Sequence, residues 1–349
     1  MKNVHGRKNE RKLLIAGSIL LCLILIYVCT VIGIASISRE EVNRILLNRL
    51  FRVPISLEGI SDGAITIIMN IRLPRVILGF LSGALLAVCG AGFQGIFKNP
   101  MADPFILGVS SGAALGASVG IVFRFGSGFA GMNLMAVLAF AGAFGTLFLV
   151  YNISRIGKKV PVSTLLLSGI AVSQTLTAVN SIIMILNRQS MDQIMFWTMG
   201  SLNGKGWNQI LMILPYAAVG LILLLTSSRE LDIMLTGEDT AIQLGVSVET
   251  LKKKVLFAAS LITASVIAVT GIIGFVGLVV PHIVRMIAGP KHRILMPLSL
   301  LFGGTFLIVC DTAARSIASW EIPVGIITSI CGGPFFLYLL RKVKRGGVS

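Results

Sequence analysis

Long uncharged stretches make up most of the chain, and their length limits the possible folds more than any other feature. Residues 76–97 and 105–123 contain no charged side chain and flank a short turn that carries Asn99 and Pro100. At about 1.5 Å per residue, a helix of either length comes close to crossing the roughly 30 Å of membrane hydrocarbon. The segment therefore predicts two neighbouring membrane-spanning helices joined by a tight hairpin.

The composition agrees with a membrane protein. Hydrophobic residues make up 55% of the 349 residues and charged residues only 13%, whereas about a quarter of an average soluble chain is charged. A net charge of +16 could suggest a nucleic-acid partner. The uncharged spans leave no soluble basic domain to bind one, so we predict a lipid bilayer and no nucleic acid as the surroundings of this chain.

The sequence predicts an all-α, polytopic membrane protein in which residues 1–349 form one transmembrane domain. The span at 255–284 is too long for one crossing, and we divide it near Gly271, which gives about ten transmembrane helices. The uncharged spans are 13–35, 76–97, 105–123, 132–151, 160–187, 207–228, 255–284, 294–310 and 322–340.

An even number of crossings places both basic ends of the chain on the same side of the membrane. With residues 1–12 as a cytoplasmic basic tail and the C-terminus also cytoplasmic, most of the 30 lysines and arginines face the cytoplasm. This is the bias that the positive-inside rule describes. We therefore predict a multi-pass protein of the plasma membrane, with residues 229–254 as a cytoplasmic loop and 36–71 as an outer segment containing an interfacial amphipathic helix.

Glycines recur every four residues along the third predicted span, at Gly108, Gly112, Gly116 and Gly120. In lipid, helices associate through small residues that allow the backbones to approach closely. We therefore interpret this stripe as a packing surface.

Several motifs resemble those of the permease family that imports iron-siderophore chelates and vitamin B12 through ATP-binding-cassette (ABC) systems, the FecCD type. They occur in one order: RLPR at 72–75, GA-x-LA-x-x-G-x-x-x-Q at 83–94, NP-x-A-x-P at 99–104, GIIGFVGLVVPHIVR at 271–285 and E-x-PVGI-x-TS-x-x-GGPFF at 321–336. The resemblance extends over most of the chain beyond Arg72. It implies the type II importer permease fold, with a second permease subunit, ATPase subunits and an extracytoplasmic substrate-binding lipoprotein as partners.

The loop at 229–254 contains a candidate coupling helix. Thr236 followed by Asp239 is a possible capping box, and Gly245 is placed to end a helix of roughly two turns. From the residues alone, an ordinary connecting loop fits equally well. The resemblance implies that this loop docks on the ATPase through Gly237, Glu238, Ala241, Leu244 and Gly245.

Three arginines at the outer ends of helices form a second candidate site. Arg72, Arg75 and Arg315 all face outward in the predicted topology. One alternative is that they extend toward lipid headgroups. The resemblance implies that they dock the binding protein by pairing with its glutamates, which suits the planar guanidinium group.

The span at 160–187 is the most polar crossing and carries no charge. Ser173, Thr177, Asn180 and Ser181 recur at intervals of three and four, which places them on one helix face. Such a face contacts either another helix or a water-filled path. The resemblance implies that this span lines the translocation path at a dimer interface, with Val162 and Ser163 near a cytoplasmic gate.

These observations favour a permease subunit that translocates an iron(III)-siderophore and is powered by a separate ATPase. The sequence lacks the G-x-x-x-x-G-K-[ST] motif of ATPases and any clustered catalytic or metal-binding set, so we predict no enzymatic activity, cofactor or metal site. Vitamin B12 and haem are alternative substrates, and the second permease could be the same or a related chain. An ion-coupled secondary transporter is disfavoured because acidic residues are scarce within the spans.

Overall fold

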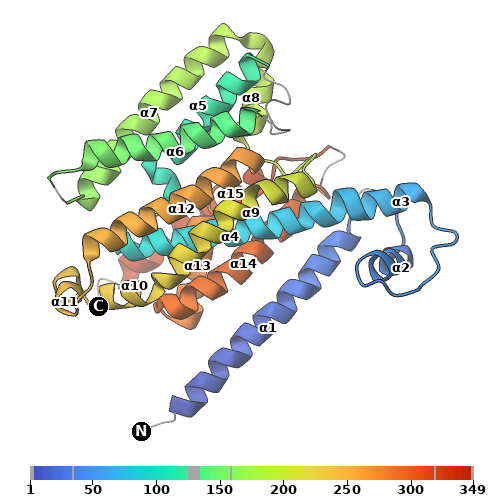
Figure 1. The fold of residues 1–349 in the computed structure, drawn as a ribbon, viewed down its shortest axis with the longest axis horizontal. Coiled ribbons are helices and arrows are strands. Elements are labelled where there is room, and N and C mark those ends of the chain that lie inside the picture. The colour runs from blue at the N-terminus through green and yellow to red at the C-terminus, as the bar shows by residue number, and fades with distance from the viewer. Residues whose placement is uncertain (1–3, 34, 125–133, 158, 318–319, 347–349) are drawn as a thin grey trace.

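The computed structural model describes residues 4–346 except 34, 125–133, 158 and 318–319. Helices form its regular structure, joined by short loops (Figure 1). Their bounds are α1 Val4–Val31, α2 Arg39–Arg49, α3 Asp62–Thr66, the π-helix η1 Ile67–Arg72, α4 Leu73–Phe97, the 3-10 helix η2 Pro104–Leu107, α5 Val109–Val122, α6 Leu134–Ser154, α7 Val162–Leu186, the 3-10 helix η4 Arg188–Ser190, α8 Met191–Thr198, α9 Trp207–Thr226, α10 Ser228–Met234, α11 Glu238–Gln243, α12 Val248–Thr270, α13 Val276–Ala288, α14 His292–Ala314 and α15 Val324–Gly346.

The predicted spans correspond to helices of the structure. Within the described residues, 7 helices are long and apolar enough to cross a membrane, and Val109–Val122, Val276–Ala288 and Val324–Tyr338 are shorter apolar helices. The two sets together match the ten crossings predicted from the sequence. Of the predicted basic tail, residues 1–3 lie outside the described part, and the backbone from Val4 onward already belongs to α1.

The division of the seventh span near Gly271 is confirmed. α12 ends at Thr270, and Gly271 has a φ of 72°, in the left-handed region that favours glycine. A Cβ atom there would lie 2.2 Å from the carbonyl oxygen of Trp197. The chain then crosses a short non-helical segment before α13 begins at Val276.

α4 lies at the centre of the bundle and α7 at its edge. In the most apolar 18-residue stretch of Asp62–Phe97, which includes α4, 83% of the residues are buried, whereas the corresponding share in α7 is 11%. α4 packs against α12, α13 and α14, whereas α5, α6 and α7 form a group on one side (Figure 1). The ends of the chain lie near the same end of the bundle as α11, and α2 and α8 lie toward the other (Figure 1).

The glycine stripe of α5 is a packing surface, as predicted. A Cβ atom on Gly112 would lie 2.3 Å from the carbonyl oxygen of Gly142 in α6, and one on Gly116 would lie 2.1 Å from that of Leu138. Only glycine allows α5 and α6 to approach this closely.

The prediction of an interfacial helix in the outer segment needs correction. α2 forms where expected, but its Val42 and Ile45 side chains are fully buried against Ala64 and Ile68 rather than facing lipid. A capping box, in which Ser38 and Glu41 exchange hydrogen bonds, fixes its first turn. The apolar face of α2 therefore belongs to a small core of the protein itself.

Candidate functional site

The predicted coupling helix is present as α11, but it begins differently from the sequence interpretation. It follows Gly237, whose φ of 125° is strained for other residues, and no side chain caps its N-terminus. The Thr236 hydroxyl instead donates to the carbonyl oxygen of Ile233, at 2.8 Å. The capping box expected between Thr236 and Asp239 is therefore wrong, and the helix extends only from Glu238 to Gln243.

One face of α11 packs on the bundle and the other is exposed. Ala241 is fully buried, and its carbonyl oxygen accepts a hydrogen bond from the backbone of Val246 at 2.9 Å. Ile242 and Leu244, by contrast, are 58% and 62% exposed. Gly245 has a φ of 84° and ends the turn. A short helix that presents two apolar side chains in this way is suited to bind a partner's groove.

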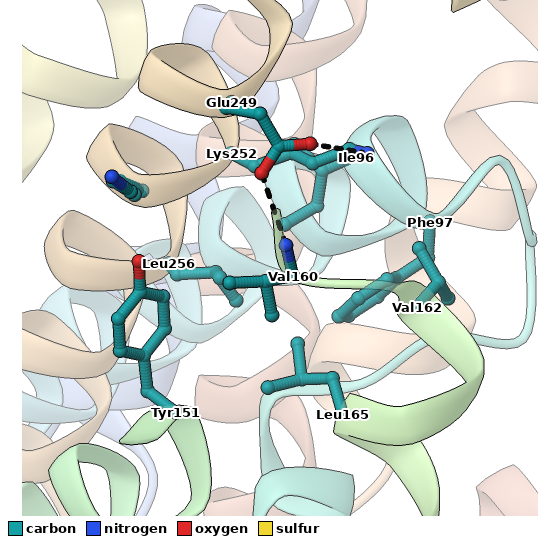
Figure 2. A pocket seen from close by; sticks show the side chains of 10 residues that line it. Ile96, Phe97, Tyr151, Val160, Val162, Leu165, Glu249, Lys252 and Leu256 are labelled. Carbon is teal, nitrogen blue, oxygen red and sulfur yellow. Dashed lines mark hydrogen bonds and ion pairs between the residues drawn. The ribbon is translucent and has the colours of Figure 1, made fainter. Parts of the chain in front are cut away.

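A buried lysine fixes the inner face of α11 to α12. Lys252 Nζ lies 3.1 Å from Glu238 Oε1 and 3.4 Å from Glu249 Oε1, and the lysine side chain is only 10% exposed. The second oxygen of Glu249 accepts a hydrogen bond from the backbone nitrogen of Val160, at 3.2 Å (Figure 2). Val160 precedes α7, so these contacts join α11, α12 and the start of α7.

The polar residues of α7 do not share one environment. Asn180 is buried, and its Oδ1 atom has no hydrogen-bond partner among the described residues. Ser173 is half-buried and donates to the carbonyl oxygen of Gly169. Thr177 and Ser181 are exposed, and the Ser181 hydroxyl donates back to the Thr177 carbonyl at 3.0 Å. The predicted stripe thus divides between a packed and an open face.

The half of α7 that begins at Val162 is also largely open. Ser163 is exposed and Val162 half-buried, near the start of the helix. Further along the same half, Leu167 and Ile170 are 68% and 53% exposed. No charged residue occurs between Val162 and Leu186. α7 therefore offers a long surface of mixed apolar and uncharged polar side chains that this chain does not cover.

The three outer arginines are buried and form bonds within this chain, so their guanidinium groups are not exposed for a partner in this structure. Arg75 Nη2 lies 2.9 Å from Asp311 Oδ1, and Arg75 Nη1 lies 2.9 Å from Glu321 Oε1. Arg315 donates to the carbonyl oxygen of Cys29, and its Nε lies 3.8 Å from Asp311 Oδ2.

Arg72 is buried too, although it pairs with no carboxylate in the described residues. Its Nη1 donates to the carbonyl oxygen of Val31 at 2.8 Å, and its Nη2 to that of Ala35. All three guanidinium groups therefore join helix ends of this chain. Their docking role stays a prediction, and in this conformation the groups are already paired.

Sequence reasoning missed Glu249, Lys252 and Val160 as a site. The spacing of Glu249 and Lys252, three residues apart on a helix, is typical of an ion pair and could have indicated that contact. Nothing in the sequence indicates the contact with Val160, which lies 89 residues away.

A second ionic contact outside the predicted sites involves Asp232. Asp232 in α10 accepts hydrogen bonds from the His292 backbone and from Arg293 Nε, the latter at 3.1 Å. Burial acts to raise the pKa of Asp232, but the hydrogen bonds from His292 and Arg293 lower it overall. This contact joins α10 to α14.

Comparison with known proteins places the chain among transport proteins. It is 47% identical over 81% of its length to the cobalamin import system permease protein BtuC of Halobacterium salinarum, covering 75% of that protein. It is 39% identical over 80% of its length to the Fe(3+)-citrate import system permease protein YfmD of Bacillus subtilis, covering 82% of it.

The fold agrees with these relatives. A solved structure described as an inward-facing conformation of an ABC transporter of the metal-chelate type matches 94% of this chain and 99% of that one, with a TM-score of 0.81 and 31% identity. The family model of the FecCD transport family matches residues 19–342. The chain therefore belongs to the FecCD transport family, as a permease of an ABC importer.

Proposed function

We propose that this permease imports an iron(III) chelate of the siderophore type, which passes between α7 and a second permease subunit. The observation that carries the proposal is the open and uncharged surface of α7. Only 11% of the residues in the most apolar 18-residue stretch of this helix are buried. In a membrane protein an uncovered apolar face can contact lipid, but exposed hydroxyl groups on the same helix favour a second subunit or a water-filled path. The second permease is either another copy of this chain or a related one.

The lack of charge on α7 favours a chelate over a bare metal ion. A bare cation needs carboxylates or other oxygen ligands to replace its water shell. A chelator already supplies these ligands and presents a bulky, polar exterior. The hydroxyls of Ser163, Thr177 and Ser181 among apolar neighbours would bind such a surface weakly, which allows the substrate to pass. The Fe(3+)-citrate permease among the relatives supports an iron chelate as the substrate.

Cobalamin is the second candidate, because the chain is 47% identical to a cobalamin permease. To decide, the complete importer is reconstituted in liposomes that enclose ATP, with its binding protein outside. We expect ATP-dependent accumulation of a ferric hydroxamate chelate and none of unchelated iron. Accumulation of cobalamin but not of the iron chelate would reject the siderophore proposal and support the second candidate.

We further propose that the exposed side of α11 docks on the ATPase, with Glu238, Ala241 and the flanking Gly237 and Gly245 giving the helix its position. Replacing Leu244 with aspartate is expected to lower chelate uptake and substrate-stimulated ATP hydrolysis by about 30-fold or more, because a central interface residue contributes about 2 kcal/mol or more. The permease itself should fold normally, since Leu244 is 62% exposed. Both activities are measured in liposomes, and docking by co-purification with the ATPase.

Phe51→Asp is the matched control for Leu244→Asp. Phe51 is an equally exposed apolar residue, 67% accessible, that follows α2 at the other end of the bundle. It should leave co-purification of the ATPase unchanged. Retention of wild-type uptake by Leu244→Asp would reject the docking proposal.

A further inference from the structure

We propose that Glu249 and Lys252 form a positioning link that transmits movement of α11 to the cytoplasmic start of α7. The inference rests on the proposed function, because it assigns to these residues the coupling between the ATPase-docked helix and the translocation path. Its basis is the continuous set of contacts from Glu238 through Lys252 and Glu249 to the backbone of Val160.

In the ionic part of the link the lysine is buried, while the Glu238 and Glu249 side chains are 39% and 32% exposed. The Lys252 side chain is 10% exposed. Its Nζ atom lies 3.1 Å from the Glu238 carboxylate and 3.4 Å from that of Glu249. A buried ammonium group is costly without partners, so Lys252 strongly favours keeping both glutamates in place. Displacement of Glu238 with α11 would therefore pull Lys252, and through it Glu249.

The Val160 end of this contact is buried, whereas the Glu249 side chain is 32% exposed. Val160 is 4% exposed, and the apolar side chains of Phe97, Val162, Leu165 and Leu256 surround it (Figure 2). The remaining cavity measures only about 10 Å³, at the lower limit for one water molecule. Because Val160 is buried, loss of Glu249 would leave its backbone N–H without this acceptor, which is costly for a buried donor.

The backbone on both sides of Val160 is restrained, so a displacement of Val160 would also displace the start of α7. Ile156 and Lys159 exchange backbone hydrogen bonds of 3.0 and 3.2 Å, which closes the turn just before Val160. Pro161, the N-cap of α7, has a restricted φ, so little slack lies between Val160 and the helix. The main packing partners of α7 are α5, α6 and η2. The Glu249 hydrogen bond thus connects α12 to the start of α7, a helix that packs mainly against other elements.

The first test compares two changes at Glu249 in the complete importer. Glu249→Ala removes both the charge and the acceptor for Val160, whereas Glu249→Gln keeps an acceptor oxygen. We expect Glu249→Ala to raise the ATP hydrolysed per chelate imported about tenfold, within the usual range of coupling free energies between sites. Glu249→Gln should stay closer to the wild type, and co-purification of the ATPase should be unchanged in both.

Arg293→Gln is the control for the loss of a cytoplasmic ion pair outside the link. Arg293 Nε lies 3.1 Å from Asp232, but the arginine side chain is 63% exposed. This variant should keep the wild-type ratio of ATP to chelate. If Glu249→Ala merely lowers the melting temperature, and the surviving complexes keep the wild-type ratio, the link is refuted and Glu249 is only structural.

A second measurement does not depend on which substrate is carried. Spin labels are attached to Lys159→Cys and Gln243→Cys in a Cys331→Ser background, since both labelled positions and Cys331 are exposed. The link predicts that the two labels keep their separation when vanadate traps the nucleotide-bound state, and that Glu249→Ala shifts or broadens it. A separation that changes equally in wild type and Glu249→Ala would overturn the proposal. If neither the iron chelate nor cobalamin is imported, the proposed substrate fails while this readout still tests the link.

Discussion

Replacing Gly90 with leucine is expected to prevent the bundle from assembling. A Cβ atom on Gly90 of α4 would lie 1.7 Å from the carbonyl oxygen of Gly277 in α13. The oxygen belongs to the backbone, and the position of the Cβ is fixed by the backbone of Gly90, so neither atom can move aside as the end of a flexible side chain would. The cost should exceed the usual overpacking penalty of about 1–3 kcal/mol, because the two helices must separate. The measurement is the yield of monodisperse permease and its thermal unfolding in detergent.

Gly145→Leu is the control for the change at Gly90. Gly145 also lies inside a helix, α6, but no atom lies within 4 Å of a Cβ placed there. This variant should unfold at or above the wild-type temperature, since leucine has the higher helix propensity. Wild-type unfolding of Gly90→Leu would show that α4 and α13 do not pack as closely as described.

Arg75→Met is expected to lower the stability of the permease by about 3–5 kcal/mol, the typical cost of breaking a buried ion pair by removing one partner. Arg75 contacts both Asp311 and Glu321 at 2.9 Å, and the Asp311 side chain is only 3% exposed. Methionine fills much of the space but leaves the Asp311 carboxylate with Arg315 alone, at 3.8 Å. Chemical denaturation in detergent measures the loss.

The double change Arg75→Met and Asp311→Leu should recover part of this stability, because it removes the unpaired carboxylate as well. The exposed Arg49→Met is the control and should have little effect. The same variants also test the docking prediction for the outer arginines. If Arg75→Met keeps the wild-type stability but loses affinity for the binding protein, Arg75 is a docking residue, and its ion pair with Asp311 does not stabilise the fold.

Charged residues show the largest differences between what the sequence predicts and where the side chains lie. The sequence correctly indicated that Arg315 lies at a helix end, but Arg75 lies inside a continuous helical segment, Asp62–Phe97, because α3 and η1 continue directly into α4. It did not indicate that Arg75 turns inward to Asp311, since these two residues are 236 positions apart, whereas Arg315 and Asp311 are only four apart. For a similar reason the apolar face of α2 was assigned to lipid, when Ile68 of a later segment covers it.

Local features of the predicted coupling loop, residues 229–254, could be predicted only in part from the sequence. Gly245 ends α11 because its φ of 84° favours glycine, and a single residue suffices to predict this. The capping pattern at Thr236 was misleading, because the hydroxyl can also bond backward to Ile233, as it does here. A match to a short pattern does not decide between two local hydrogen bonds of similar strength.

The sequence by itself determined the membrane class, the ten crossings, the break at Gly271 and the glycine packing stripe. These follow from the length of uncharged spans and from backbone geometry, which depend on neighbouring residues. Only the tertiary structure decided which charges are buried, which face of α7 stays open and that Glu249 reaches Val160. Those outcomes depend on which distant segments meet when the helices pack, and a contact across 89 residues leaves no periodic trace in the sequence.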